Sequence, residues 1–169
     1  MLSTLCCVEP PCRLWEILAQ RLETLQNVSG LWQSGDVRSS VEALVASHDD
    51  AALLDFINTV HRRPAVFTLD TAALVLPRLA DFTIHAHSEY RIASLRLLLS
   101  LAKHFAPVLP EFRRGPKSGF FDLAAEERAK KAGKILGEFR SLQASVMVLK
   151  ACREPEVARL AGEVRNCSA

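Results

Sequence analysis

The sequence predicts an all-helical protein built from stacked antiparallel helical hairpins. Strand signals are weak, because no long run alternates apolar with polar residues and no Asn-Gly or Asp-Gly pair joins β-branched segments. Apolar residues instead recur at spacings of three and four in nearly every segment. With 169 residues, of which 49% are hydrophobic, the chain is long enough to bury one good-sized core.

Three helices are expected in the first third of the chain. The first follows Pro10 and Pro11 and ends at residues 34–36, where Asp36 caps the second. The second ends at a turn over residues 49–50, and the third stops before Pro64. Their apolar stripes are Leu14, Leu18, Leu25, Val28 and Trp32; then Val37, Val41, Leu44, Val45 and His48; then Leu53, Ile57 and Val60.

Two more helices are expected in the middle of the chain. Asp70 is the expected N-cap of the first, and Pro77 is expected to kink it because proline removes one backbone hydrogen bond. The second begins at Ser88 and is the most apolar helix of the sequence, which predicts that it lies at the centre of the fold. Pro107 and Pro110 end it.

A basic loop and a long helix follow. Residues 113–121 predict an exposed loop that carries Arg113 and Arg114. After Asp122, apolar residues alternate at spacings of four and three, which predicts a long helix of about 30 residues or roughly 45 Å. These residues are Ile135, Phe139, Leu142, Val146 and Leu149. The whole pattern predicts either a compact bundle or a short armadillo-like solenoid, ending in one long helix.

The expected organisation is one helical interaction domain over residues 13–152. A flexible N-terminus over residues 1–12 precedes it, and the basic loop 113–121 lies inside it. Residues 153–169 offer little apolar surface, so we expect a weakly ordered tail with one short helix after Pro155.

Composition excludes several classes of protein. The 21 basic and 19 acidic side chains leave a net charge of +2, so nothing in the overall charge favours nucleic acid or a membrane as a partner. No apolar run approaches the roughly 20 residues that cross a bilayer, and the N-terminus does not resemble a signal peptide. The cysteines form no C-x-x-C pair, which predicts reduced thiols in the cytosol; they are Cys6, Cys7, Cys12, Cys152 and Cys167.

No motif predicts catalysis. The segment 115–118 superficially resembles a phosphate-binding loop, but it lacks the upstream glycine and the preceding strand, and Pro116 removes a backbone N–H. His85 and His87 would diverge on a helix and have no third metal ligand at a suitable spacing. The sequence therefore predicts a protein that is not an enzyme and has no metal and no cofactor.

One concentrated basic surface is expected at the start of the long helix. Arg128, Lys131 and Lys134 follow one another at spacings of three, and Lys130 lies beside them. This ridge is either a solvated face with Glu127 paired to Lys131, or a surface that binds an acidic polymer.

Three segments together resemble the C-terminal domain of the regulatory subunit of katanin, the microtubule-severing ATPase. They are LWQSGDV at 31–37 with SSVEALVASHDDAALLDFINTV at 39–60, FTLDTAALVLPRLADF at 67–82, and DLAAEERAKKAGKILGEFRSL at 122–142. They follow the order of the family over roughly residues 13–150. Each segment alone is an ordinary amphipathic helix, so the resemblance rests on their colinearity.

The resemblance implies a non-catalytic regulatory module. Such a domain would heterodimerise with the N-terminal helical domain of the katanin ATPase subunit, promote microtubule binding and severing, and recruit spindle-pole or minus-end-binding proteins. By position, the microtubule-facing stretch of the family falls on Arg128 and Lys131, extended by Lys130 and Lys134. With Arg113 and Arg114 of the loop, these residues would face the acidic tails of tubulin.

The expected contacts with the ATPase subunit are apolar residues of the early helices: Trp32, Val37, Val41, Phe56 and Ile57. Each could equally be a core residue. The implied location is the cytoplasm and the cytoskeleton, at microtubules, spindle poles and centrosomes, with the nucleus an option for a paralogue. The family's WD-repeat propeller does not precede Met1, which suggests a fragment, a short isoform or a paralogue. The alternative function is a helical scaffold that binds peptide motifs without touching microtubules.

Overall fold

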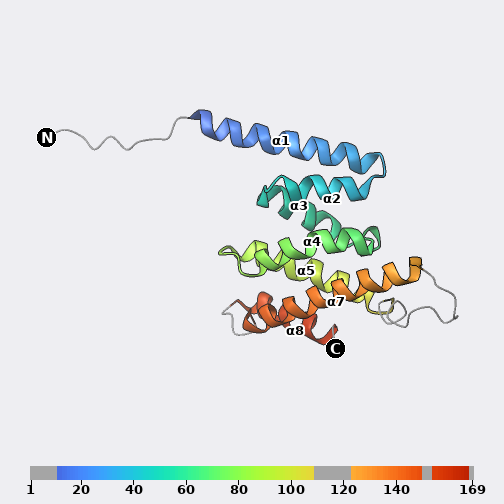
Figure 1. The fold of residues 1–169 in the computed structure, drawn as a ribbon. Helices are drawn as coiled ribbons and strands as arrows, with labels where there is room; N and C mark the ends of the chain where they lie inside the picture. The colour runs from blue at the N-terminus through green and yellow to red at the C-terminus, as the bar shows by residue number, and fades with distance from the viewer. Residues whose placement is uncertain (1–10, 109–122, 150–153, 168–169) are drawn as a thin grey trace.

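The computed structural model describes residues 11–108, 123–149 and 154–167, and the described residues contain seven α-helices, one short 3-10 helix and no strand (Figure 1). The all-α class expected from the sequence is confirmed. The elements are α1 (Pro11–Gln33), α2 (Val37–Ala46), α3 (Asp50–Val60), η1 (Pro64–Val66), α4 (Leu69–Thr83), α5 (Ser88–Phe105), α7 (Leu123–Leu149) and α8 (Pro155–Cys167).

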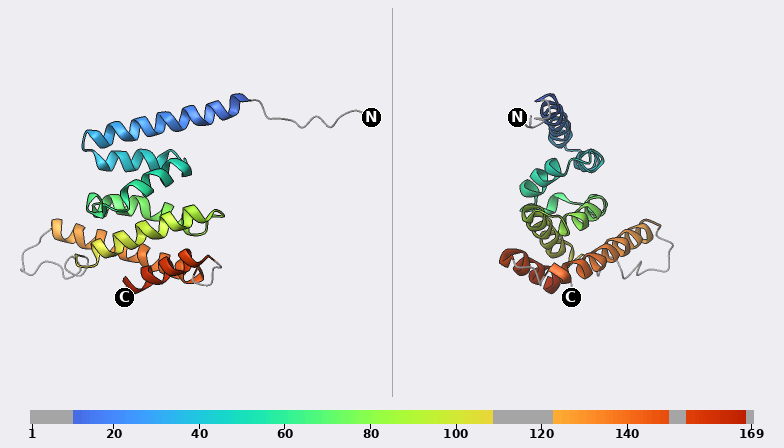
Figure 2. Two further views of the ribbon diagram at one scale, coloured as in Figure 1. Left: turned by 180° about the vertical axis from the view of Figure 1, so that it is seen from behind. Right: turned by 90° about the vertical axis from the view of Figure 1, so that its left-hand side faces the viewer.

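The helices stack in layers, with α1 at one end of the molecule and α7 and α8 at the other (Figures 1 and 2). In this stack α1 packs on α2, α2 packs on α4, and α4 lies against α5 and α7. Helix α8 completes the last layer by packing on α5 and α7. The stacking of helices expected from the sequence is thus observed, and α1 and α7 lie at opposite ends of the stack.

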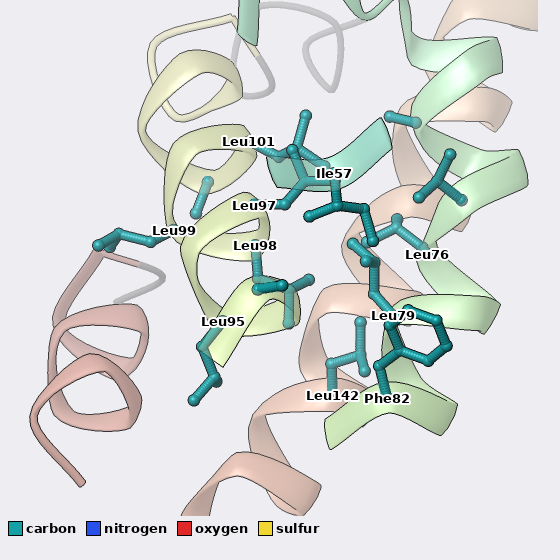
Figure 3. Close-up of a cluster of buried hydrophobic side chains, with 14 of the residues drawn as sticks. Ile57, Leu76, Leu79, Phe82, Leu95, Leu97, Leu98, Leu99, Leu101 and Leu142 are labelled. Atoms are coloured by element: carbon teal, nitrogen blue, oxygen red, sulfur yellow. The ribbon is translucent and has the colours of Figure 1, made fainter. Parts of the chain in front are cut away.

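The centre of the core is α5, as its sequence predicts. Leu95, Leu97, Leu98 and Leu101 are completely buried although they point in different directions around the helix. Ile57 of α3 and the α4 and α7 side chains shown in Figure 3 surround one side, and Leu99 extends toward α8. The hydroxyl of Ser94 is buried too, and it donates a hydrogen bond to the backbone carbonyl of Leu79 over 2.8 Å.

Side-chain caps set the beginnings of the early helices. The Asp36 carboxylate accepts from the backbone N–H of Ser39 at 3.0 Å and caps α2, as expected, after a turn in which Gly35 has a φ of +84°. The Asp49 carboxylate caps α3 by accepting from the backbone N–H groups of Ala51 and Ala52, each at 3.0 Å.

The expected cap of α4 is wrong. Thr68 is the N-cap, and its hydroxyl and that of Thr71 each accept from the other's backbone N–H in a capping box. Asp70 instead lies in the first turn of α4, where its charge interacts favourably with the helix dipole. The helix continues through Pro77, which is exposed.

The C-terminal segment differs from the weakly ordered tail that was expected. Helix α8 covers 13 residues, and it buries Val157, Leu160, Ala161 and Val164 against the rest of the fold. Two ion pairs to α5 fix its beginning, Arg91 to Glu154 and Arg96 to Glu156, each at 2.6 Å.

Other organisational expectations fall largely outside the described residues. The whole basic loop 113–121 lies outside the described residues, and so does most of the expected N-terminal segment 1–12. Helix α1 begins at Pro11, inside that segment. Cys167 is a free thiol.

We expect Leu160→Ala to lower the free energy of unfolding by about 2–5 kcal/mol, because it opens a cavity beneath α8. Chemical denaturation followed by circular dichroism would measure the loss. Ile84→Ala, at an exposed position, is the matched control and should change stability little. Equal stability of the two variants would mean that α8 is not docked in solution.

We expect acid to destabilise the fold partly through Asp49. Burial raises the pKa of this carboxyl, but the hydrogen bonds from Arg21 and from the Ala52 and Ala51 amides outweigh burial and hold the pKa below its usual value. The stabilisation is present above the unfolded pKa of about 3.9 and is lost as the pH falls through the lower folded value.

Asp49→Asn should therefore flatten the decline of unfolding free energy on acidification below about pH 5, while an amide oxygen remains to cap α3. Denaturation curves at a series of pH values would measure this slope. Asp55→Asn removes the same charge from an exposed position on α3 and serves as control. Parallel pH profiles for the parent chain and Asp49→Asn would contradict the assignment.

Candidate functional site

The N-terminal half of α1 carries an exposed apolar surface. Of the seven large exposed hydrophobic residues in the described part of the chain, five lie within this half-helix, the other two being Ile84 and Leu123. Trp15 is 71% exposed and Leu14 is 60% exposed. We call this surface the α1 patch; its members are Leu14, Trp15, Ile17, Leu18 and Leu22.

Helix lengths explain why the patch is uncovered. Helix α1 has 23 residues and spans about 35 Å, whereas α2, on which it packs, has 10 residues and spans about 15 Å. The C-terminal half of the α1 stripe reaches the body, where Val28 is buried and Leu25 and Trp32 pack against the core. The N-terminal half extends past the end of α2 (Figures 1 and 2).

A polar cleft of about 390 Å³ borders the α1 patch. Ile17 of the patch lines it together with Arg21 and Tyr90. Arg21 donates from Nε to Oδ2 of Asp49 at 2.9 Å, which ties α1 to the cap of α3. Burial raises the pKa of Tyr90, so its phenol stays protonated and able to donate a hydrogen bond at neutral pH.

The five expected contacts with a partner divide into two groups. Val41 and Ile57 are completely buried in the core of this chain, so the structure assigns them to packing and contradicts their assignment to a partner surface. Trp32, Val37 and Phe56 are half-buried and keep part of their surface exposed. The sequence pattern could not separate these groups, because all five lie on apolar stripes.

The expected basic ridge is exposed on α7. Arg128, Lys130, Lys131 and Lys134 all reach solvent, while Ala132 and Ile135 on the opposite side are buried. The ammonium group of Lys131 pairs with the Asp70 carboxylate of α4 at 3.0 Å, rather than with Glu127 as the solvated-face alternative supposed. Both partners are substantially exposed, so this pair contributes little to stability. Arg113 and Arg114 lie outside the described residues.

The histidines have structural surroundings. The ring of His85 lies against the ring of Tyr90, with 4.0 Å between centroids, and Nδ1 of His61 is 3.2 Å from the carbonyl oxygen of Ile57. Within residues 11–108, 123–149 and 154–167, no group of three His, Cys, Asp or Glu side chains is placed to hold a metal ion. No helix in those ranges is long and apolar enough to cross a membrane.

Comparison with known proteins decides the family. The con80 domain of katanin matches residues 13–167, which include every described helix apart from the first two residues of α1. The chain belongs to the katanin con80 family. The family indicated by the colinear segments of the sequence is confirmed.

Individual relatives agree with this family. The chain is 25% identical over 126 residues to the katanin p80 WD40 repeat-containing subunit B1 of Danio rerio, which covers 75% of this chain and 18% of that protein. It is 28% identical over 124 residues to the homolog KTN80.3 of Arabidopsis thaliana, which covers 73% of this chain and 15% of that protein. The con80 chain thus spans less than a fifth of the length of these relatives.

Sequence reasoning placed two members of the α1 patch on an apolar stripe, Leu14 and Leu18, but did not identify the patch as a site. Trp15, Ile17 and Leu22 were missed altogether. A signal was available, since these residues widen the stripe in the first half of the helix beyond what one neighbour covers.

Proposed function

We propose that this con80 chain is a non-catalytic regulatory module that heterodimerises with the katanin ATPase subunit through the α1 patch. The observation that carries the proposal is the concentration of five exposed large apolar residues on one projecting half-helix. Contiguous apolar surface of this kind typically marks a protein interface. Membership of the katanin con80 family supports the identity of the partner.

The chemistry of the patch suits a helical partner. Trp15 supplies an aromatic anchor of the type that dominates interface energies, and the flanking Leu14 and Leu18 supply apolar area that excludes water. An exposed helical stripe with three- and four-residue spacing packs naturally on another helix. The N-terminal helical domain of the ATPase subunit is the partner implied by the family resemblance.

The basic ridge would provide the contact with microtubules. It lies on α7, at the other end of the stack from α1, so occupation of the α1 patch leaves it accessible (Figure 1). Clustered lysines and arginines attract the acidic tails of tubulin within a Debye length, about 8 Å at physiological salt. In this proposal the module strengthens microtubule engagement and severing by the ATPase, and helps to place it at spindle poles, centrosomes or minus ends.

To test the first contact, we expect Trp15→Ser combined with Leu18→Asp to abolish co-purification with the N-terminal domain of the ATPase subunit. The charge would be buried without a partner at the centre of the interface. Size-exclusion chromatography of the mixed proteins would measure complex formation. Both positions are exposed in the isolated chain, so circular dichroism should remain unchanged.

The matched control for this experiment is Leu123→Asp, which alters another exposed hydrophobic residue at the start of α7, at the opposite end of the stack from α1. The control should bind like the parent chain. If the α1 double variant binds the ATPase domain normally, the partner contact lies elsewhere. If even the parent chain forms no complex, the heterodimer proposal fails.

To test the second contact, we expect Lys130→Glu with Lys134→Glu to reduce microtubule co-sedimentation of the heterodimer by about tenfold or more. Sedimentation of the parent heterodimer should weaken steeply with salt, and that dependence should be shallower in the variant. Lys103→Glu, on an exposed position of α5, is the control. Unchanged sedimentation of the variant would mean that the basic ridge is an ordinary solvent-exposed surface. That result would favour a scaffold without microtubule contact.

A further inference from the structure

A second cleft lies beside the C-terminal half of α1, separate from the α1 patch. It has a volume of about 560 Å³, within the range of sites that hold a ligand or a short peptide segment. Residues of α1, α2, α3 and η1 line it, so it occurs where the first layers of the stack meet. None of the five members of the α1 patch lines this cleft.

The lining is mainly apolar and includes two aromatic rings. Val28, Leu44 and Val60 are buried and contribute to it from three different helices. Trp32 and Phe56 are half-buried and meet edge to face, with 5.7 Å between ring centroids and an interplanar angle of 81°. An apolar side chain that enters the cleft would therefore meet two aromatic rings on well-packed supports.

The charged groups of the cleft are two cations and one anion, and its two hydroxyls, of Ser29 and Thr59, already take part in hydrogen bonds within α1 and α3. Arg62 and Arg63 line it and are exposed, and neither forms an ion pair with another described residue. Asp55 is the sole carboxylate among the lining residues. The indole N–H of Trp32 donates no hydrogen bond to another described residue. These groups favour a ligand that supplies negative charge and hydrogen-bond acceptors.

The arginine pair lies on an ordered turn. The backbone N–H of Arg63 donates to the carbonyl of Val60 at 2.8 Å, and the N–H of Val66 donates to the carbonyl of Arg63 at 3.1 Å. Pro64, directly after Arg63, begins η1 and restricts the backbone of the turn. Because the turn is ordered before any ligand arrives, less entropy is lost when a ligand binds there.

We propose that this cleft binds a short acidic segment of a partner protein, in which one apolar side chain packs against the rings of Trp32 and Phe56 and neighbouring carboxylates face Arg62 and Arg63. The inference goes beyond the proposed heterodimer, since it concerns a different surface and a different ligand. It gives a specific location to peptide binding by the helical stack.

Other occupants fit less well. In a second copy of the chain, the projecting half of α1 carries Arg13 and Arg21 as well as Glu16, so it does not supply the excess of negative charge that the arginine pair favours. A membrane surface cannot enter a concave cleft, and two arginines supply little attraction for anionic lipid compared with a polybasic cluster. The charge and shape together favour a peptide.

The test is selection of random short peptides by the full chain, compared with selection by Arg62→Glu/Arg63→Glu. We expect the parent chain to enrich peptides with an apolar residue flanked by acids, and the variant to enrich basic peptides instead. An acidic peptide selected by the parent should bind the variant about tenfold or more weaker. Lys130→Glu/Lys134→Glu makes the same change of charge on α7 and should leave the selected peptides unchanged.

Fluorescence would locate the bound peptide. The chain has two tryptophans, so Trp15→Phe leaves Trp32 as the single indole, and its emission should shift when the selected peptide covers it. Phe56→Ala should weaken the same titration while circular dichroism shows the fold intact.

Several results would overturn the proposal. Failure to enrich acidic peptides, indifference of the selected peptides to charge reversal at Arg62 and Arg63, or sensitivity to the α7 variant instead would each do so. Cleft-dependent binding of phosphatidylserine vesicles without peptide binding would assign the site to lipid. Co-purification of Arg62→Glu/Arg63→Glu with the ATPase domain is measured separately. A failure of the peptide site can then be told apart from a failure of the heterodimer.

Discussion

The burial of most of the surface of α5 is the constraint on which the rest of the structure depends. Its leucines point in several directions, so one neighbouring helix could never remove them from water. Helices α3, α4 and α8 and the short η1 all contact it. Because η1 follows α3 directly, this packing also fixes the turn that carries Arg62 and Arg63, and thereby links the core to one of the exposed surfaces.

Local sequence signals predicted most of the helices and their order, because apolar spacing and helix caps are properties of short segments. These signals failed where the outcome depended on a helix far away in the same chain. The apolar residues of α8 have the right spacing, Val157, Leu160, Ala161 and Val164, but their burial depends on the side of α5 that the earlier helices leave open. The cap at Thr68 was missed because its reciprocal partner is Thr71, whereas the familiar motif has Glu or Gln at that position.

The candidate site was less predictable than the fold. Apolar periodicity shows which face of a helix avoids water, but it does not show whether that face meets the same chain or another protein. Val41 and Trp15 are both apolar residues of early helices, yet one is completely buried and the other is the most exposed member of the α1 patch. The difference comes from the unequal lengths of α1 and α2, which becomes meaningful only when their packing is known.

The layered stack also determines how its surfaces can influence one another. Helix α1 makes its main contacts with α2 and α3, and α7 makes its main contacts with α4 and α8, so several layers separate the α1 patch from the basic ridge. Among the described helices, none makes extensive contact with both α1 and α7. In the proposed function, engagement of one surface would therefore act on the other chiefly through tethering, which raises the effective concentration of the second contact without any change of shape. Such a module would combine weak contacts by avidity rather than by allostery.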